Sequence, residues 1–175
     1  MLVIESLDRA TRRSARVYAE VRGYGLSADG FHVTSPEPSG AGASRAMHAA
    51  LRAAALAPDD IDYVSAHGTG TPANDRAEAV ALRAVFGERA SRLPVSSVKS
   101  MIGHSMGAAS AIESVVCCLA LRDGVVPPTI NHETPDPDCP LDCVPNTARR
   151  LPLRAVMNNS FAFGGNNAVV IFTAV

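Results

Sequence analysis

The chain has 175 residues, the size of one domain or of one piece of a larger protein. Its 16 basic and 17 acidic residues give a net charge of −1, which argues against a basic nucleic-acid-binding surface and against a polyacidic tail. A hydrophobic fraction of 47% with 19% charged residues excludes a disordered chain.

Apolar runs, helical periodicity and turn residues predict the secondary structure. In chain order the predicted elements are a strand at 1–4, a helix at 8–15, a strand at 17–24, a loop at 25–42, a helix at 43–56, a strand at 61–66, a helix from 75 that Gly87 ends, a strand at 94–98, a helix at 105–122, a Pro-rich irregular segment at 127–145 and two strands at 157–163 and 168–172. Alternating strands and helices predict an α/β fold with a mixed sheet in a single domain.

Two of these helices carry further expectations. Asp75 and Glu78 are spaced as an N-cap residue and its N3 partner, so we expect the helix to begin at Asp75. In the helix at 105–122, Glu113 is the only charged residue before Arg122, and the remainder is small or apolar on every side. A helix of this composition is expected to be buried in the middle of a protein.

Targeting signals and membrane spans are not expected. No charged and then apolar leader follows Met1, and the longest uncharged apolar run, 114–121, is far shorter than the roughly 20 residues that cross a bilayer. We therefore predict a cytoplasmic protein that binds neither membrane nor nucleic acid.

Two histidines follow predicted strands beside small or hydroxyl residues. His67 begins a His-Gly-Thr-Gly-Thr segment, and His104 ends a Lys-Ser-Met-Ile-Gly-His segment. Ligands of α/β proteins bind at the carboxyl ends of strands, and two imidazoles near a cation suit the stabilisation of a developing oxyanion or enolate. Lys99 is the only lysine against 15 arginines, which suggests that an ammonium is needed at this position. A purely structural role for each histidine is the alternative.

The remaining histidines and the four cysteines give weaker signals. We expect His32, His48 and His132 to be surface or packing residues. Cys139 and Cys143 have no second ligand pair after them, which disfavours a zinc site, and no metal site is predicted. Cys117 and Cys118 are expected to be core thiols in mid-helix, too far from a helix N-terminus to be activated as nucleophiles. The chain thus has acid–base groups but no evident nucleophile.

Ordered motifs in the sequence resemble those of the β-ketoacyl-acyl-carrier-protein synthases, especially the dissociated ketosynthase II of fatty-acid synthesis and its polyketide relatives. The motifs are His67-Gly-Thr-Gly-Thr71 with Asp75 and Glu78, Lys99-Ser-x-x-Gly-His104 with Gly107-Ala-Ala109 and Glu113, Pro127-Pro-Thr-Ile-Asn131, and Asn159-Ser-Phe-x-Phe-Gly-Gly165. Together these motifs make the resemblance cover essentially the whole chain.

The resemblance implies a thiolase-like fold of which this chain is the C-terminal half, a mixed five-stranded sheet flanked by helices. Residues 1–175 would be one ketosynthase C-terminal domain, and residues 1–16 resemble the end of the N-terminal half. The nucleophilic Cys belongs to that N-terminal half, so this chain is expected to be inactive alone. Full-length members of the family are expected to be homodimers.

The implied reaction is decarboxylative Claisen condensation of malonyl-carrier protein with an acyl thioester. Its substrates are carried on the phosphopantetheine of acyl carrier protein, and no further cofactor is implied. The resemblance gives three groups of site residues: the catalytic residues His67, His104 and Lys99, the supporting acids Glu113, Asp75 and Glu78, and Thr69, Thr71, Phe161 and Phe163, which contact the substrate arm or gate the acyl pocket.

The sequence departs from the family pattern at two positions. Ala162 stands where many members have Gly, and Asn166 where many have Thr, so gating by Phe163 is expected to differ. Two other functions are considered. A non-catalytic partner or gene relic would bind acyl chains or carrier protein without condensing them. A thiolase that uses coenzyme A is disfavoured because thiolases lack this Lys and His spacing.

Overall fold

The computed structural model of the chain describes residues 2–175. Its elements in chain order are α1 (Leu7–Arg12), β1 (Glu20–Ala28), α2 (Ala41–Ala54), β2 (Tyr63–Ser65), α3 (Pro72–Phe86), β3 (Val95–Ser96), α4 (Lys99–Ile102), α5 (Ala109–Asp123), β4 (Val125–Val126), β5 (Arg149–Arg150), β6 (Ala155–Ala162) and β7 (Asn166–Thr173). Short 3-10 turns occupy Pro58–Asp60, Gly87–Ser91, Met106–Ala108 and Phe163–Gly165. Among these described residues, no helix is both long and apolar enough to cross a membrane.

Five strands form one mixed sheet in the order β1-β7-β6-β2-β3, which confirms the expected architecture. β2 runs parallel to both β3 and β6, whereas β7 runs antiparallel to β1 and β6. β6 and β7 form the predicted hairpin, with Ala162 opposite Asn166 next to the turn. The two parallel strands β2 and β3 are short, and the polypeptide that follows each of them emerges at the same edge of the sheet.

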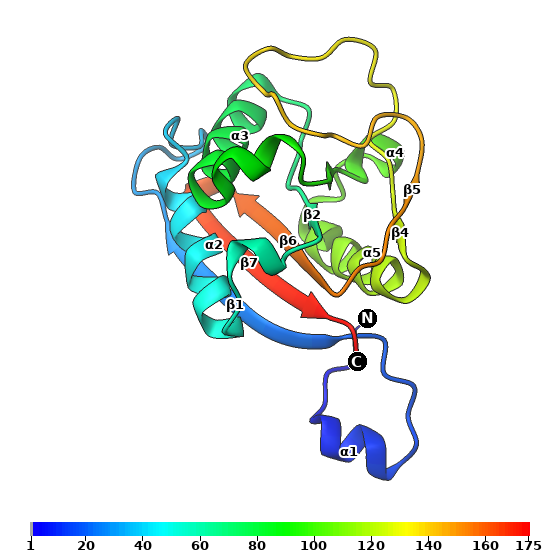
Figure 1. Cartoon of the computed structure of the whole chain (residues 1–175). Coiled ribbons are helices and arrows are strands. Elements are labelled where there is room, and N and C mark those ends of the chain that lie inside the picture. The colour runs from blue at the N-terminus through cyan, green and yellow to red at the C-terminus, as the bar shows by residue number, and fades with distance from the viewer. Residues whose placement is uncertain (1) are drawn as a thin grey trace.

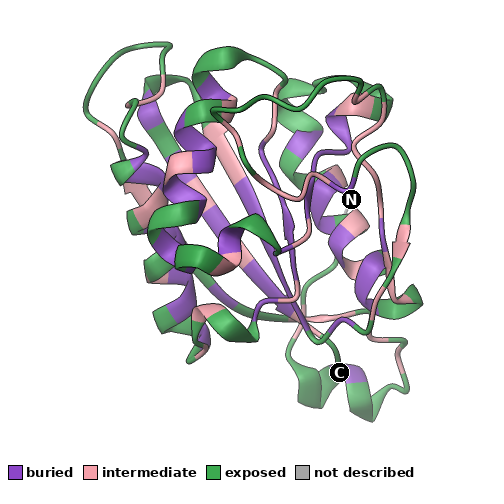
Figure 2. Ribbon diagram, turned by 45° about the horizontal axis from the view of Figure 1, so that its top comes forward, coloured by how far each residue is buried: buried purple, intermediate pink, exposed green. Residues whose placement is uncertain are grey.

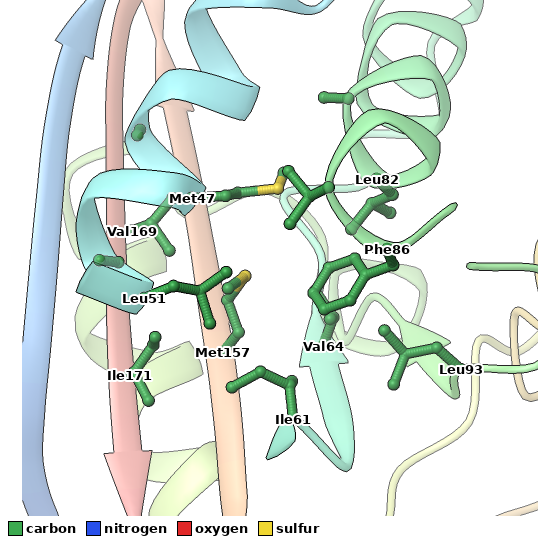
Figure 3. Close-up of a cluster of buried hydrophobic side chains, with 14 of the residues drawn as sticks. Met47, Leu51, Ile61, Val64, Leu82, Phe86, Leu93, Met157, Val169 and Ile171 are labelled. Atoms are coloured by element: carbon green, nitrogen blue, oxygen red, sulfur yellow. The ribbon is translucent and has the colours of Figure 1, made fainter. Parts of the chain in front are cut away.

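Helices cover both faces of this sheet (Figure 1). α2 and α3 lie on one face, where Met47, Leu51 and Leu82 pack with strand residues such as Val64 and Met157 (Figure 3). This is the larger hydrophobic cluster, and its packing is close because β1 presents glycines to α2. A Cβ atom on Gly25 would lie only 2.0 Å from the backbone oxygen of Ala46.

α5 lies on the opposite face, against β6 and β7. Its residues Cys117, Ala120 and Leu121 form a second cluster with Tyr63, Val156 and Phe172 among others. The expectation that this helix is buried on all sides is wrong for this chain, because Val115 and Leu119 on its outer side are 41% and 36% exposed. Figure 2 shows the same division, with buried residues toward the sheet and exposed residues away from it.

The first residues do not form the predicted strand. Met1 lies outside the described residues, and Leu2 to Ile4 have no sheet neighbour; Val3 is 80% exposed and Ile4 76%. An apolar run needs a partner strand to become a sheet strand, and none is adjacent here. α1 is shorter than predicted and projects away from the sheet (Figure 1).

Other helices and strands begin or end at residues different from those predicted, because turns set their boundaries. β1 continues to Ala28, so the predicted loop at 25–42 is reduced to the residues before α2. The predicted helix at 105–122 begins only at Ala109, since Gly103 has φ of +74° and a 3-10 turn follows it. Lys99 is instead part of the four-residue helix α4.

The predicted start of α3 at Asp75 is wrong. The helix begins at Pro72, with Thr71 as its N-cap residue. Proline suits the first helical position because its φ is already helical and its missing N–H is not needed there. Glu78 is therefore free of the capping role, and its carboxylate is used elsewhere. Gly87 ends the helix as predicted.

Candidate functional site

His67 and His104 lie side by side although they are 37 positions apart in the sequence. Because β2 and β3 are parallel neighbours, the segments that follow them meet at one edge of the sheet. The two imidazole rings are 5.5 Å apart between centroids and stand nearly perpendicular at 81°. His67 is buried and His104 is exposed, so the pair connects the interior to the surface.

Glu78 fixes the backbone at His67. Its carboxylate accepts the N–H groups of His67 at 3.0 Å and Gly68 at 2.9 Å, and the side-chain amide of Asn159 at 3.0 Å. Burial raises the pKa of Glu78, and these three hydrogen bonds oppose the rise. The carboxylate predicted to cap a helix therefore joins α3, the His67 loop and β6. Asp75 lies nearby and accepts a hydrogen bond from the Asn74 amide at 3.0 Å.

Lys99 and Glu113 form a buried ion pair. Their side chains are 5% and 2% exposed, and Nζ of Lys99 also donates to the carbonyl oxygen of His67 at 2.6 Å. Among the described residues, the second oxygen of Glu113 has no hydrogen-bond partner. Burial raises the pKa of Glu113, and the adjacent ammonium offsets part of that rise. A carboxylate buried in an apolar helix would be costly without such a cation.

The hydrogen bonds of the two imidazoles define which ring nitrogen carries the proton. Nζ of Lys99 is 3.5 Å from Nδ1 of His67, and the backbone N–H of Met106 points at Nδ1 of His104 at 3.2 Å. Both neighbours can only donate, so each Nδ1 accepts and each neutral ring carries its proton on Nε2. Burial, followed by the charge of Lys99, lowers the pKa of His67 to about 3. His67 is therefore a neutral Nε2–H donor at physiological pH.

A cavity of about 460 Å³ opens beside these groups. Lys99, His104 and Thr69 lie in its lining, as do Asp75 and Glu78. The hydroxyl oxygens of Thr69 and Thr71 are 2.8 Å apart, but Thr71 itself is not part of the lining. The cavity thus combines a cation, imidazoles and hydroxyl groups, and its volume is in the range of small-molecule binding sites.

The sequence did not indicate three further residues of this cavity. Cys139, Cys143 and His132 line it, although they come from the Pro-rich segment, for which no element was predicted. His132, for which we expected a surface or packing role, is half-buried and lies in the cavity lining. Burial and the charge of Asp136 raise the pKa of Cys139 to about 11, and burial also raises that of Cys143. Neither thiol is an activated nucleophile.

The two phenylalanines of the site differ in position. The ring centroids of Phe161 and His67 are 5.6 Å apart, whereas Phe163 is 65% exposed. Ala162 between them has φ −142° and ψ 162°, which is ordinary strand geometry and carries no strain in this conformation. Within residues 2–175, no group of three or more His, Cys, Asp or Glu side chains could hold a metal ion.

Comparison with known protein families identifies the family of this chain. The family model described as "Beta-ketoacyl synthase, C-terminal domain" matches residues 18–133 of the chain. The chain belongs to the β-ketoacyl synthase family. It is 49% identical over 174 residues to the 3-oxoacyl-[acyl-carrier-protein] synthase 2 of Coxiella burnetii, a match that covers 99% of this chain and 42% of the relative. The Staphylococcus aureus (strain COL) synthase of the same name is 50% identical over 172 residues, with 98% and 42% coverage.

Solved ketosynthase structures share the fold. The ishigamide ketosynthase/chain length factor matches with a TM-score of 0.93 and 51% identity, over 98% of this chain and 41% of that chain. A type II polyketide ketosynthase in complex with its acyl-carrier protein matches with a TM-score of 0.95 and 41% identity, over 98% of this chain and 42% of that one. The thiolase-like fold is thus confirmed, and the chain spans about 42% of the length of the curated relatives it matches.

Proposed function

We propose that residues 1–175 form the C-terminal domain of a 3-oxoacyl-acyl-carrier-protein synthase, with residues 1–16 continuing from an N-terminal half. The reaction is decarboxylative Claisen condensation of malonyl-carrier protein with an acyl thioester, in fatty-acid or polyketide synthesis. The observation that carries the proposal is the pair of Nε2–H donors beside the buried Lys99–Glu113 ion pair. Acid–base groups of this kind stabilise the enolate of a thioester.

The reaction proceeds in two steps. The malonyl thioester loses CO2 as its carbon–carbon bond breaks, and the bonding electrons become an enolate whose negative charge lies on the thioester oxygen. Nε2–H of His67 and of His104 donates hydrogen bonds to that oxygen. The enolate carbon then attacks the acyl thioester carbon, and a cysteine thiolate leaves, so that the extended product remains on the carrier.

Lys99 and Glu113 act on His67 rather than on the substrate. The ammonium holds Nδ1 and the carbonyl oxygen of His67, which keeps the Nε2 proton directed away from it. A neutral His67 cannot supply a full positive charge, so its contribution is a fixed dipole in a water-poor site. Glu113 balances the charge of Lys99 at low dielectric.

The nucleophilic cysteine is supplied by the N-terminal half in this proposal. Cys117 is fully buried in the α5 cluster on the other face of the sheet, and burial raises its pKa. Cys139 and Cys143 line the cavity, but their pKa values are also raised. Among the described cysteines, none has the lowered pKa that a thioester-forming nucleophile needs.

The substrate arm is proposed to be the phosphopantetheine of acyl carrier protein, with no further cofactor. Its amides and hydroxyl suit a cavity lined by Thr69 and other hydroxyl residues. Thr71, Phe161 and Phe163 are the other proposed contacts. Phe163 is exposed, and we propose that its ring gates the acyl pocket. Relatives bear the carrier protein in their names, and one solved ketosynthase is in complex with it. The full-length enzyme is proposed to be a homodimer.

Reconstitution tests this function. The chain is expressed with and without the N-terminal portion of the Staphylococcus aureus synthase, and CO2 release and β-ketoacyl product are measured with acyl- and malonyl-carrier protein. We expect turnover only from the pair, and its loss in His67→Ala and His104→Ala. Cys139→Ser is the matched control for a cavity residue outside the proposed chemistry, and it should remain active.

Three outcomes would contradict the proposal. Turnover by the chain alone that disappears in Cys139→Ser would place the nucleophile in this chain. Turnover by the pair that survives both histidine substitutions would refute the assigned roles. Tight binding of acyl-carrier protein by the pair without CO2 release would favour the non-catalytic partner instead.

A further inference from the structure

The backbone of the dipeptide His67-Gly68 is held at every polar atom. Glu78 accepts both N–H groups, and Lys99 donates to the carbonyl oxygen of His67. The remaining atom, the carbonyl oxygen of Gly68, accepts a hydrogen bond from the hydroxyl of Ser97 at 2.7 Å. Ser97 is buried and belongs to the turn between β3 and α4, two residues before Lys99.

Gly68 packs directly against this serine. Its φ is +41°, and a Cβ atom added there would lie 2.6 Å from Cβ of Ser97 and 3.0 Å from its Oγ. A side chain at this position is therefore excluded by both conformation and space. The two segments approach closely enough that a shift of Ser97 would be transmitted to the His67 loop.

Ser97 is itself fixed by the Pro-rich segment. Its backbone N–H donates to the hydroxyl of Thr129 at 3.1 Å, and its carbonyl oxygen accepts from the hydroxyl of Ser100 at 2.8 Å. Ser100 in turn accepts the N–H of Ile130 at 3.0 Å. Ser97, Ser100, Thr129 and Ile130 all line the cavity, so one network joins the cavity lining to the histidine.

We propose that Ser97 is a positioning residue for His67: its hydroxyl holds the Gly68 carbonyl and thereby fixes the imidazole beside His104. The catalytic consequence rests on the proposed function, but the positional claim does not. Ser97 is thus more than a buried polar residue, because its hydroxyl donates to the carbonyl oxygen of Gly68, the residue that follows His67.

The test compares three variants of the full chain by NMR, with 15N-labelled histidine. Ser97→Ala removes the hydroxyl. Ser97→Cys keeps the shape of the side chain but donates only weakly, so it separates the hydrogen bond from packing. Ser114→Ala is the matched control: Ser114 is similarly buried and also donates to a backbone carbonyl at 2.7 Å, that of Ser110 on the other face of the sheet.

Ser97→Ala and Ser97→Cys should shift the His67 ring-nitrogen resonances and raise the titration midpoint of His67 by about one pH unit or more toward the ordinary 6.5 of an exposed imidazole. Lys99, His104 and Glu113 face this ring or its cation, and Glu78 binds the backbone N–H groups of His67 and Gly68. All four groups are unchanged in these variants. Ser114→Ala should lower the unfolding temperature and leave the ring-nitrogen resonances and the titration midpoint of His67 unchanged. A merely structural Ser97 would behave like Ser114, with unchanged His67 resonances, and that result would overturn the proposal.

The same variants, paired with the N-terminal half, separate this inference from the proposed function. Ser97→Cys should reduce kcat roughly tenfold or more while KM changes less than about twofold, because displaced donors weaken enolate stabilisation more than binding. A wild-type kcat in Ser97→Cys would contradict the positioning role. If the wild-type pair shows no turnover, the proposed function fails, whereas the NMR comparison still decides the positioning role of Ser97.

Discussion

At the residue scale, the site depends on one lysine in a chain that otherwise uses arginine. Lys99 has three donors on a compact ammonium, and it directs them to Glu113, the carbonyl of His67 and Nδ1 of the same residue. A planar guanidinium would present a fixed fork instead and could not point at these three acceptors around one atom. The compositional bias directed attention to Lys99, and the structure shows this lysine buried and paired with Glu113.

Removing one member of this pair should destabilise the chain strongly. Lys99→Met leaves the Glu113 carboxylate buried without its counter-charge, and we expect a loss of about 3–5 kcal/mol in the free energy of unfolding. The double variant Lys99→Met/Glu113→Leu should recover most of that loss, because an apolar pair of similar volume replaces the ions. Urea unfolding followed by circular dichroism measures both.

The exposed pair of Arg122 and Asp123 provides the control. Their side chains are 38% and 46% exposed, so Arg122→Met should leave the unfolding midpoint essentially unchanged. A double variant at Lys99 and Glu113 no more stable than Lys99→Met alone would show that the loss does not arise from an uncompensated charge.

The role of Glu78 could be predicted only in part from the sequence. Its spacing from Asp75 matched a capping pattern, and a carboxylate near a helix start was the local interpretation. The structure places Pro72 at the start of the helix and turns Glu78 inward to His67, Gly68 and Asn159. Asn159 is 81 residues away in sequence, and no local pattern could have indicated that contact.

At the scale of elements, short parallel strands and glycines at close contacts determine the geometry. β2 and β3 share only two pairs of residues, yet they bring His67 to the segment that carries Lys99 and His104. The opposite edge of the sheet depends on β1, whose Gly23 and Gly25 allow α2 to lie almost against the strand backbone. Such close approach needs residues without a Cβ atom.

A methyl group at this contact should separate the helix from the strand. In Gly25→Ala the new Cβ would meet the Ala46 oxygen at 2.0 Å and the Ala50 nitrogen at 2.5 Å, both of them backbone atoms. Because backbone cannot move aside alone, we expect a loss of about 1–3 kcal/mol or more in the free energy of unfolding. Thermal and urea unfolding measure the change.

Gly107 is the matched control for the same substitution. A Cβ there would meet no atom within 4 Å, so Gly107→Ala should stay within about 0.5 kcal/mol of the wild type. Equal effects of the two substitutions would show that the glycine at β1 contributes through chain flexibility rather than through close packing.

At the scale of the whole molecule, one side of the sheet is only partly covered. Tyr24 and Leu26 alternate with the glycines that face α2, so they point to the α5 side, where Val170 and α5 lie. They are 64% and 67% exposed, and Val115 and Leu119 on α5 are exposed as well. We call these four residues the open apolar face. The proposed occupant is the N-terminal half, since relatives are more than twice as long.

The chain alone should therefore associate with itself. Sedimentation velocity at rising concentration should show reversible oligomers, and the double variant Val115→Gln/Leu119→Gln should remain monomeric because two apolar contacts become polar. The same variant should weaken capture of the N-terminal half. As a control, Val33→Gln changes an exposed valine whose carbonyl oxygen binds Gly164 in the turn between β6 and β7, and it should leave both properties intact. A monomeric wild type that captures the N-terminal half equally well in all variants would contradict the assignment.

The sequence by itself determined the α/β class, the family and the longer helices and strands of the sheet, because periodicity, turn residues and motifs are local properties of the chain. Only the tertiary structure decided that Glu78 binds the backbone of His67, that both histidines are Nε2–H donors, and that Cys139, Cys143 and His132 line the same cavity as Lys99. These facts depend on contacts between segments far apart in sequence. Parallel strand pairing and burial create such contacts, and neither leaves a local signal.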